Sequence, residues 1–437
     1  MYRVFFVTMP VRMKSNSKRV LDLLRTYESP NMLHIEPNGS WPIVWERAKG
    51  TRVWDADGKE YLDLTAAFGV AAAGHANPRV VAAARRQLGR LPHAMGDVHP
   101  HAPKAALARE LSRLTFERWT GGRFAGKTIF NNSGFEAVEA ALKTARLASG
   151  RRGIVAFTGA YHGLGYGALN ATHRPFFRAP FLSQLGRFGR FAPFPKSDSD
   201  LPPLRARLNE LLRGKSIGAV LVEPIQARGG INVPPAGFLP LLRQLCDRHG
   251  ALLVLDEIFT GFGRTGKWFA CEESATLPDL ICLGKALTGG FPLSACVGRA
   301  DIIDAAWPPS AGEAIHTSTF QGNPVGCAMA LAQIAEIGAR ELPGRAAETG
   351  IFLLDSLRAD ISVPGRRLQV RGRGLMAGLE ITNDPRLVMR VIKDMLRRGF
   401  ILLPEGARGD VISFTPPLTI RRAELAAAVA ALKESLA

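Results

Sequence analysis

The sequence has no long hydrophobic run. None of its apolar segments approaches the ~20 residues that a membrane-spanning helix needs. The apolar stretch in the N-terminal MYRVFFVTMPVRMK is also shorter than the ~7–15 residues of a signal-peptide core. We therefore expect no membrane association and no signal peptide. We also expect translation to start at Met9 or Met13 rather than at Met1.

Cysteine is scarce. The five cysteines form no CxxC pair, and their number is odd. A disulfide framework and a zinc site both need paired or clustered cysteines, so both are disfavoured. The sequence predicts reduced thiols, a cytoplasmic location and no metal.

Acidic residues are also few, with 38 Asp and Glu against 56 Lys and Arg, which gives a net charge of +18. A basic surface attracts anions, so a nucleic-acid binder is one alternative. However, the arginines are scattered, no block of five or six like charges occurs, and no aromatic-interleaved basic patch is present. We expect no nucleic-acid partner; a strongly salt-dependent DNA affinity would revive that alternative.

The middle of the chain alternates short apolar runs with helical patterns. This alternation is typical of βαβ units, and it predicts an α/β fold with a mostly parallel sheet and helices on both faces. We place a large domain at 61–330 and a smaller α+β domain built from 1–60 and 331–437. Strands are expected at 127–132, 153–159, 217–226, 251–257, 279–284 and 293–298, with helices at 135–149 and 237–250. In the C-terminal part, 371–381 is expected to form one strand.

Polar residues follow several of these strands, where ligands of parallel sheets bind. Lys285 ends one strand within GKALTGG; an apolar pocket there would lower its pKa and make its amine a nucleophile. Asp256 ends another apolar strand and needs a cationic partner. Ser133 and Gly134 open a helix whose free N–H groups suit a phosphate. The ordinary alternatives are a solvated lysine, a loop-capping acid and a simple serine N-cap.

The segment GFGRTG (261–266) matches the GxGxxG pattern of dinucleotide-binding enzymes and follows a strand. The residues after it, KWFACEESATLPD, lack a helical period and contain an early proline. Because the fingerprint requires a helix at that point, a dinucleotide-dependent oxidoreductase is the weaker alternative.

Taken together, the motifs resemble the fold-type I pyridoxal 5'-phosphate enzymes, and within them the class III aminotransferases. That family includes ornithine, acetylornithine, gamma-aminobutyrate and other ω-aminotransferases. The resemblance runs from Pro42 to the C-terminus. It is carried by VWDADGKEYLDL (53–64), NNSGFEAVEAALKTAR (131–146), AYHG (160–163), VEPIQ (222–226), LDEIFTGFGRTG (255–266), PDLICLGKALTGGFPLSA (278–295) and HTSTFQGNP (316–324).

The resemblance implies the activity: ping-pong transamination from an amino acid or ω-amine donor to a 2-oxo acid acceptor. It implies that Lys285 holds pyridoxal 5'-phosphate as a Schiff base and then shuttles a proton. Asp256 would pair with the pyridine nitrogen. A racemase or an aminomutase on the same fold would carry the same lysine and aspartate, so these alternatives stay open; a requirement for a 2-oxo acid would distinguish them.

The resemblance also implies how the cofactor is held and how subunits assemble. Ser133, Gly134 and the Phe135 amide would hold the phosphate, with Thr319 reaching it from a neighbouring subunit. The enzyme would be a homodimer or a dimer of dimers. The remaining cofactor contacts would be Tyr161, which would stack on the ring, His162, and Glu223, which would support the site.

The sequence departs from the family pattern at four positions. Phe135 stands where alanine or threonine is usual, and Phe259 replaces a glutamine. Many members pair a glutamate in the loop after VEPIQ with an arginine before the PPL segment, whereas this chain has Arg228 and Ser413 there. Arg228 could bind a substrate carboxylate. Alternatively, it faces solvent or a neighbouring acid.

Overall fold

The computed structural model describes residues 17–37 and 40–436 of the chain. The candidate initiators Met9 and Met13 lie outside the described residues. Within the described ranges, no helix is both long and apolar enough to cross a lipid bilayer.

A seven-stranded sheet forms the centre of the protein, in the order β4-β10-β9-β8-β7-β5-β6. Strands β9, β8, β7, β5 and β6 run parallel, whereas β10 is antiparallel to both of its neighbours. The prediction of a mostly parallel sheet is therefore confirmed. The strands are β4 (Gly126–Asn131), β5 (Gly153–Phe157), β6 (Gly189–Ala192), β7 (Ile217–Val222), β8 (Leu252–Asp256), β9 (Leu280–Leu283) and β10 (Ser294–Arg299).

Both faces of this sheet are buried, which explains why its strands are apolar without interruption. In β8, Leu253 and Leu255 face one cluster while Val254 faces the other. The first cluster includes side chains of α4 (Ala102–Ser112), α9 (Leu201–Arg213), α10 (Phe238–His249) and α12 (Pro324–Ala339). The second includes side chains of α6 (Gly134–Ser149) and α11 (Ala300–Ala306). The alternation of strand side chains thus anchors a helical layer on each face.

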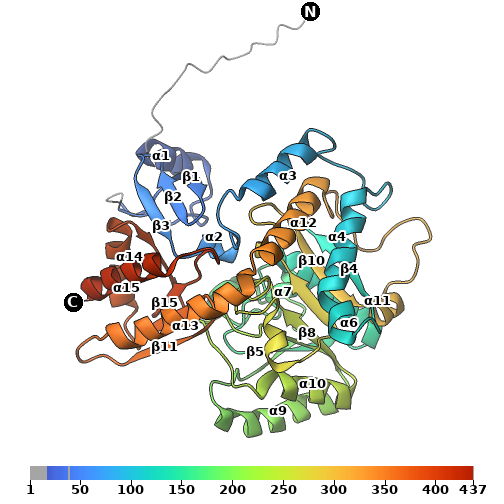
Figure 1. Cartoon of the computed structure of the whole chain (residues 1–437). Helices are drawn as coiled ribbons and strands as arrows, with labels where there is room; N and C mark the ends of the chain where they lie inside the picture. Colours follow the sequence, from blue (N-terminus) through green and yellow to red (C-terminus); the bar gives the residue numbers. More distant parts are fainter. Residues whose placement is uncertain (1–16, 38–39, 437) are drawn as a thin grey trace, which may run out of the picture.

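Segments from the two ends of the chain lie together in a smaller lobe beside the sheet (Figure 1). β13 pairs in parallel with β3, so N- and C-terminal residues share one sheet. A second small sheet has the order β11-β12-β15-β14. The proposed domain limits stay a prediction. The elements are α1 (Ser17–Tyr27), β1 (Trp45–Lys49), β2 (Arg52–Asp55), β3 (Glu60–Asp63), α13 (Leu342–Asp360), β11 (Leu368–Arg373), β12 (Met376–Ile381), α14 (Pro385–Arg397), β13 (Phe400–Ile401), β14 (Leu403–Glu405), β15 (Val411–Phe414) and α15 (Arg422–Leu436).

The expectation of a single strand over 371–381 is wrong. The chain turns at Gly374, whose φ of 55° lies in the left-handed region, and β11 pairs with β12 as a hairpin. Glycine reaches that region without the steric cost that a side chain would add.

The same turn packs directly against α13 and makes Gly350 sensitive to substitution. A methyl group at Gly350 would lie 2.1 Å from the Gly374 carbonyl oxygen, and neither backbone can move aside easily. We expect Gly350→Ala to lower the free energy of unfolding by about 1–3 kcal/mol. Gly344→Ala in the same helix is the control, because nothing lies within 4 Å of that position. Thermal unfolding should show a lower Tm for Gly350→Ala alone; equal Tm values for the two variants would contradict this packing.

Candidate active site

A cavity of about 410 Å³ lies where β5, β7, β8 and β9 end and α6 begins. This is the edge at which open parallel sheets bind ligands. The predicted residues that line it are Gly134, Phe135, Tyr161, His162, Glu223, Arg228, Asp256 and Lys285. The fold therefore brings together residues that are far apart in sequence.

Lys285 is held in an unusual backbone conformation at one wall of the cavity. Its φ is 41°, a value that costs a non-glycine residue energy and that clusters at functional sites. Burial lowers the pKa of the Lys285 ammonium, although Asp256 and Glu223 oppose this shift. Its Nζ lies 4.9 Å from the centre of the Phe259 ring and makes no ion pair with the described residues. A lowered pKa favours the neutral, nucleophilic amine.

Asp256 lies at the carboxyl end of β8 and is 5% exposed. Its Oδ2 is 2.8 Å from Nδ1 of His162, and its Oδ1 accepts a hydrogen bond of 3.1 Å from the Ile258 amide. Since a carboxylate only accepts, Nδ1 of His162 carries the proton. Nε2 of His162 is buried and finds no partner among the described residues. His162 thus fixes the orientation of Asp256.

The start of α6 offers an anion site. The amides of Gly134 and Phe135 donate to no other group among the described residues, as expected for the first turn of a helix. The nearby Glu136 carboxylate instead accepts from the Ser133 amide at 2.7 Å and the Ser133 hydroxyl at 2.9 Å. Two free amides at a helix N-terminus fit a phosphate group.

The bulky Phe135 is accommodated by a glycine opposite it. A Cβ atom on Gly163 would lie 2.3 Å from the Phe135 Cβ, so the loop after β5 approaches α6 closely only because residue 163 is glycine. The replacement at position 135 therefore leaves the amides of the first turn in place.

Glu223 connects two loops that border the cavity. Its carboxylate accepts from the Tyr161 amide at 2.9 Å and from the Ala227 amide at 3.1 Å. Burial raises the pKa of Glu223 to about 7. These hydrogen bonds fix the backbone beneath the Tyr161 ring, which lines the cavity edge-on to Phe177 at 5.5 Å between ring centres.

Arg228 also lines the cavity rather than pointing wholly away from it. Its guanidinium carbon lies 4.9 Å from the centre of the Tyr161 ring. Its nearest acidic partner is Glu405, with 3.9 Å between Arg228 Nε and Glu405 Oε2. The sequence analysis missed Glu405, because a lone glutamate at the end of a short strand gives no signal before the fold places it beside residue 228.

Three positions singled out in the sequence do not line the cavity: Ser133, which directly precedes the lining residue Gly134, and Thr319 and Ser413. Thr319 is exposed in the segment between α11 and α12 and does not line the cavity. Ser413 is buried within β15, where it pairs with Leu403 and Gly378. The arginine that many family members carry before the PPL segment therefore has no counterpart at position 413.

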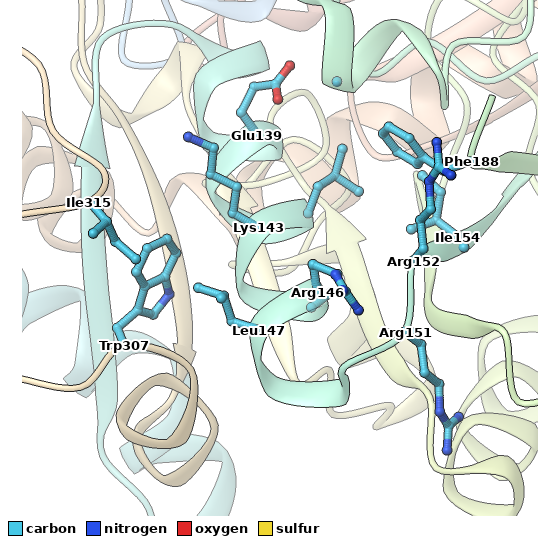
Figure 2. A pocket seen from close by; sticks show the side chains of 15 residues that line it. Glu139, Lys143, Arg146, Leu147, Arg151, Arg152, Ile154, Phe188, Trp307 and Ile315 are labelled. Carbon is cyan, nitrogen blue, oxygen red and sulfur yellow. The ribbon is translucent and has the colours of Figure 1, made fainter. Parts of the chain in front are cut away.

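A second cavity, of about 530 Å³, lies beside α6 at a distance along the helix from its first turn (Figure 2). Its basic side chains are Lys143, Arg146, Arg151 and Arg152. Arg151 and Arg152 donate to the backbone carbonyls of His249 and Gly186, at 2.9 and 2.8 Å. None of the predicted site residues lines this second cavity.

The GFGRTG segment forms consecutive turns and is followed by the short 3₁₀ helix η4 (Ala270–Ser274). Arg264 within it is buried and donates to the carbonyls of Leu375 and Pro416, at 2.9 and 2.5 Å. These hydrogen bonds connect the segment, which follows β8 of the large sheet, to the C-terminal part of the chain. The helix that a dinucleotide site requires is not formed there.

Comparison with known proteins gives one consistent result. The family model for class-III aminotransferases matches residues 35–436. A putrescine aminotransferase of Pectobacterium atrosepticum is 36% identical over 98% of this chain and 90% of its own length. An acetylornithine aminotransferase of Methanopyrus kandleri is 38% identical over 92% and 96%.

Solved structures agree with this result. The ornithine aminotransferase of Toxoplasma gondii matches with a TM-score of 0.85 and 29% identity, covering 96% of this chain and 95% of that one. An amine transaminase from an uncultivated Pseudomonas species, solved with pyridoxal phosphate bound, matches at 0.83 and 31%, covering 94% and 98%. These matches do not support the racemase, aminomutase or dinucleotide alternatives. The chain belongs to the class-III aminotransferase family, and it is a fold-type I enzyme that uses pyridoxal 5'-phosphate to transfer an amino group from an amine donor to a 2-oxo acid.

Proposed function

We propose that Lys285 is the residue to which the cofactor attaches and that the cavity beside it is the site of amino transfer. When bound, pyridoxal 5'-phosphate supplies a carbonyl that takes up the amino group and a ring that withdraws electrons. The observation that carries the proposal is a lysine amine with a lowered pKa and a buried carboxylate, placed at two strand ends that border one cavity.

Lys285 has a second task in this proposal. Once the donor has taken its place, the free amine removes the proton from the carbon that bears the donor's amino group, and later returns a proton. Burial lowers the pKa of the Lys285 amine, which favours the neutral form that can accept that proton.

The other residues hold the cofactor. Asp256, oriented by His162, would pair with the protonated ring nitrogen, and Tyr161 would stack on the ring. Glu223 would act as a positioning residue through the Tyr161 amide. Ser133 and the free amides of Gly134 and Phe135 would bind the phosphate.

We further propose a homodimer, or a pair of dimers, in which Thr319 contacts the phosphate in the neighbouring subunit. Support comes from the segment that carries Thr319, where Ile315 is 75% exposed and Phe320 is 60% exposed. Exposed apolar side chains of this size favour a protein–protein contact. The reduced setting of the cytoplasm is proposed because all five cysteines are free and buried.

Mixed dimers test the role of Thr319. Lys285→Ala dimers should be inactive, and Thr319→Ala dimers should need more cofactor for activity. If each site combines Lys285 of one subunit with Thr319 of the other, co-refolding the two variants creates one site with both native residues. We expect activity at limiting cofactor to appear on mixing. If the mixture only averages the two parents, Thr319 acts within its own subunit or not at all.

The donor is proposed to be an aliphatic compound with a terminal amino group. The relatives named for putrescine, acetylornithine and, in Pseudomonas aeruginosa, 5-aminovalerate share this feature. A panel of such amines, offered with pyruvate or 2-oxoglutarate, tests the function. Turnover should require the 2-oxo acid; turnover without any oxo acid would instead indicate a racemase or an aminomutase.

A further inference from the structure

Glu405 is a buried carboxylate whose bonding within the described residues is incomplete. It ends β14 and is 7% exposed. Its side chain accepts no hydrogen bond from the described residues, and its one ion-pair contact is the 3.9 Å approach of Arg228 Nε. That distance is too long for a hydrogen bond. A buried carboxylate in this state is costly, so an unfilled donor position beside it calls for an explanation.

Arg228 is incompletely bonded as well. Its Nε atom is buried and has no hydrogen-bond partner among the described residues. Its side chain is 38% exposed and rests on the Tyr161 ring, so the guanidinium has room to turn. Opposite charges with incomplete bonding therefore meet where Arg228 lines the cavity, with Glu405 next to it.

The surroundings of Glu405 are cationic. Burial raises the pKa of Glu405 to about 7, whereas Arg228, Arg174 and Lys285 act in the opposite direction. Arg174 lies over the Phe177 ring, 5.3 Å from its centre, and donates to the Ala407 carbonyl at 3.4 Å.

The backbone keeps Glu405 and Arg228 together. The Gly406 amide donates to the Arg228 carbonyl at 3.2 Å. A Cβ atom on Gly230 would lie 3.2 Å from the Gly406 Cα, so the two loops touch. Glu405 does not itself line the cavity; it lies next to Arg228, which does, so a movement of the long Arg228 side chain is what would expose Glu405 there.

A ping-pong enzyme seats its donor and its acceptor in the same cavity, one after the other. A diamine presents a second ammonium group at its far end, whereas a 2-oxo acid presents a carboxylate. An arginine that lines the cavity, with an acid next to it, offers one group for each of these two charges.

We propose that Glu405 selects diamine donors by binding their distal ammonium group, while Arg228 turns to bind the carboxylate of the 2-oxo acid in the other half-reaction. The inference rests on the proposed function, in which the amine beside Lys285 reacts. In the resting enzyme, Glu405 and Arg228 neutralise each other. Each substrate then replaces one member of this pair.

The test uses the holoenzyme in single-turnover donor half-reactions without oxo acid. The two donors are 1,4-diaminobutane and 1-aminobutane, which differ only in the distal amine. We expect Glu405→Gln to lower the second-order rate constant for the diamine roughly 10- to 100-fold, as loss of a charge-assisted hydrogen bond implies. The constant for 1-aminobutane should stay within about twofold.

The acceptor half-reaction separates recognition from structural damage. Glu405→Gln should leave the KM for the oxo acid unchanged or lower it, because Arg228 is released. Arg228→Ala should raise that KM roughly 10-fold or more, and it should not lower the second-order rate constant for the diamine. Asp410→Asn is the matched control, since it removes an acid from the same turn that faces Arg408; it should not change the preference for the diamine.

Two outcomes overturn the inference. If Glu405→Gln slows both amines equally, or neither, Glu405 does not read the distal ammonium. If Glu405→Gln does not fold, the Arg228→Ala enzyme decides the question. A lower rate constant for the diamine in Arg228→Ala would then overturn the inference. A native enzyme that reacts with neither amine contradicts the proposed terminal-amine function itself, which is a distinguishable result.

Discussion

Replacing Lys285 with alanine is expected to lower the rate of transamination by roughly 10⁴-fold or more, because nucleophile and proton carrier are lost together. The cofactor should then come off on dialysis, since its covalent attachment is gone. Steady-state kinetics and the cofactor content after dialysis measure the two effects. Within the described residues, no other lysine lines the 410 Å³ cavity, so no neighbouring amine is placed to substitute.

Lys143→Ala is the control for this experiment. Lys143 lies on the same helix that begins at the proposed phosphate site, but it lines the second cavity (Figure 2). Its Nζ is 3.0 Å from Nδ1 of His316. We expect near-native activity and cofactor retention. An active Lys285→Ala enzyme that keeps its cofactor would contradict the role of Lys285.

Asp256→Asn is expected to lower kcat roughly 10²- to 10³-fold, because the cavity loses the fixed negative charge that stabilises a protonated ring nitrogen. Asparagine has nearly the same shape, so the cofactor should still attach at Lys285. The step that removes the substrate proton should slow most. A larger isotope effect with donor deuterated at the reacting carbon would register that change.

Asp279→Asn offers a matched comparison. Asp279 is buried like Asp256 but precedes β9, at the opposite end of the strands, and pairs with Arg243 at 2.8 Å. Its replacement should reduce stability while leaving kcat per folded enzyme near the native value. Equal losses of kcat in the two variants would contradict a specific role of Asp256 in the reaction, because the loss would then follow from removing any buried acid of the sheet.

The central sheet and its crevice could be predicted because short-range patterns determine them. Strands such as β7 and β8 are continuous apolar runs, and parallel strands place their carboxyl ends at one edge. That rule predicts from the sequence alone that Lys285 and Asp256 lie at one site. The apolar pattern of 371–381 predicts one strand, whereas Gly372 and Gly374 interrupt it and the chain forms a hairpin at Gly374.

The pairing of Arg228 with Glu405 could not be predicted in this way. Arg228 was recognised as unusual, but its partner Glu405 comes from a different sheet and from the far end of the sequence. Neither the hydrophobic pattern nor any local motif links them. Their proximity depends on how the 227–231 loop meets the turn after β14, which only tertiary packing determines.

The most direct test of the account is chemical trapping of the cofactor in the native holoenzyme. Borohydride reduces the imine between the cofactor and its lysine to a stable amine. The cofactor then stays attached during proteolysis and serves as a label that mass spectrometry can locate. We predict that the label lies on the peptide that contains Lys285 and on no other. A label on a different lysine, or a holoenzyme whose cofactor cannot be trapped, would contradict the assignment of Lys285 as the reacting centre.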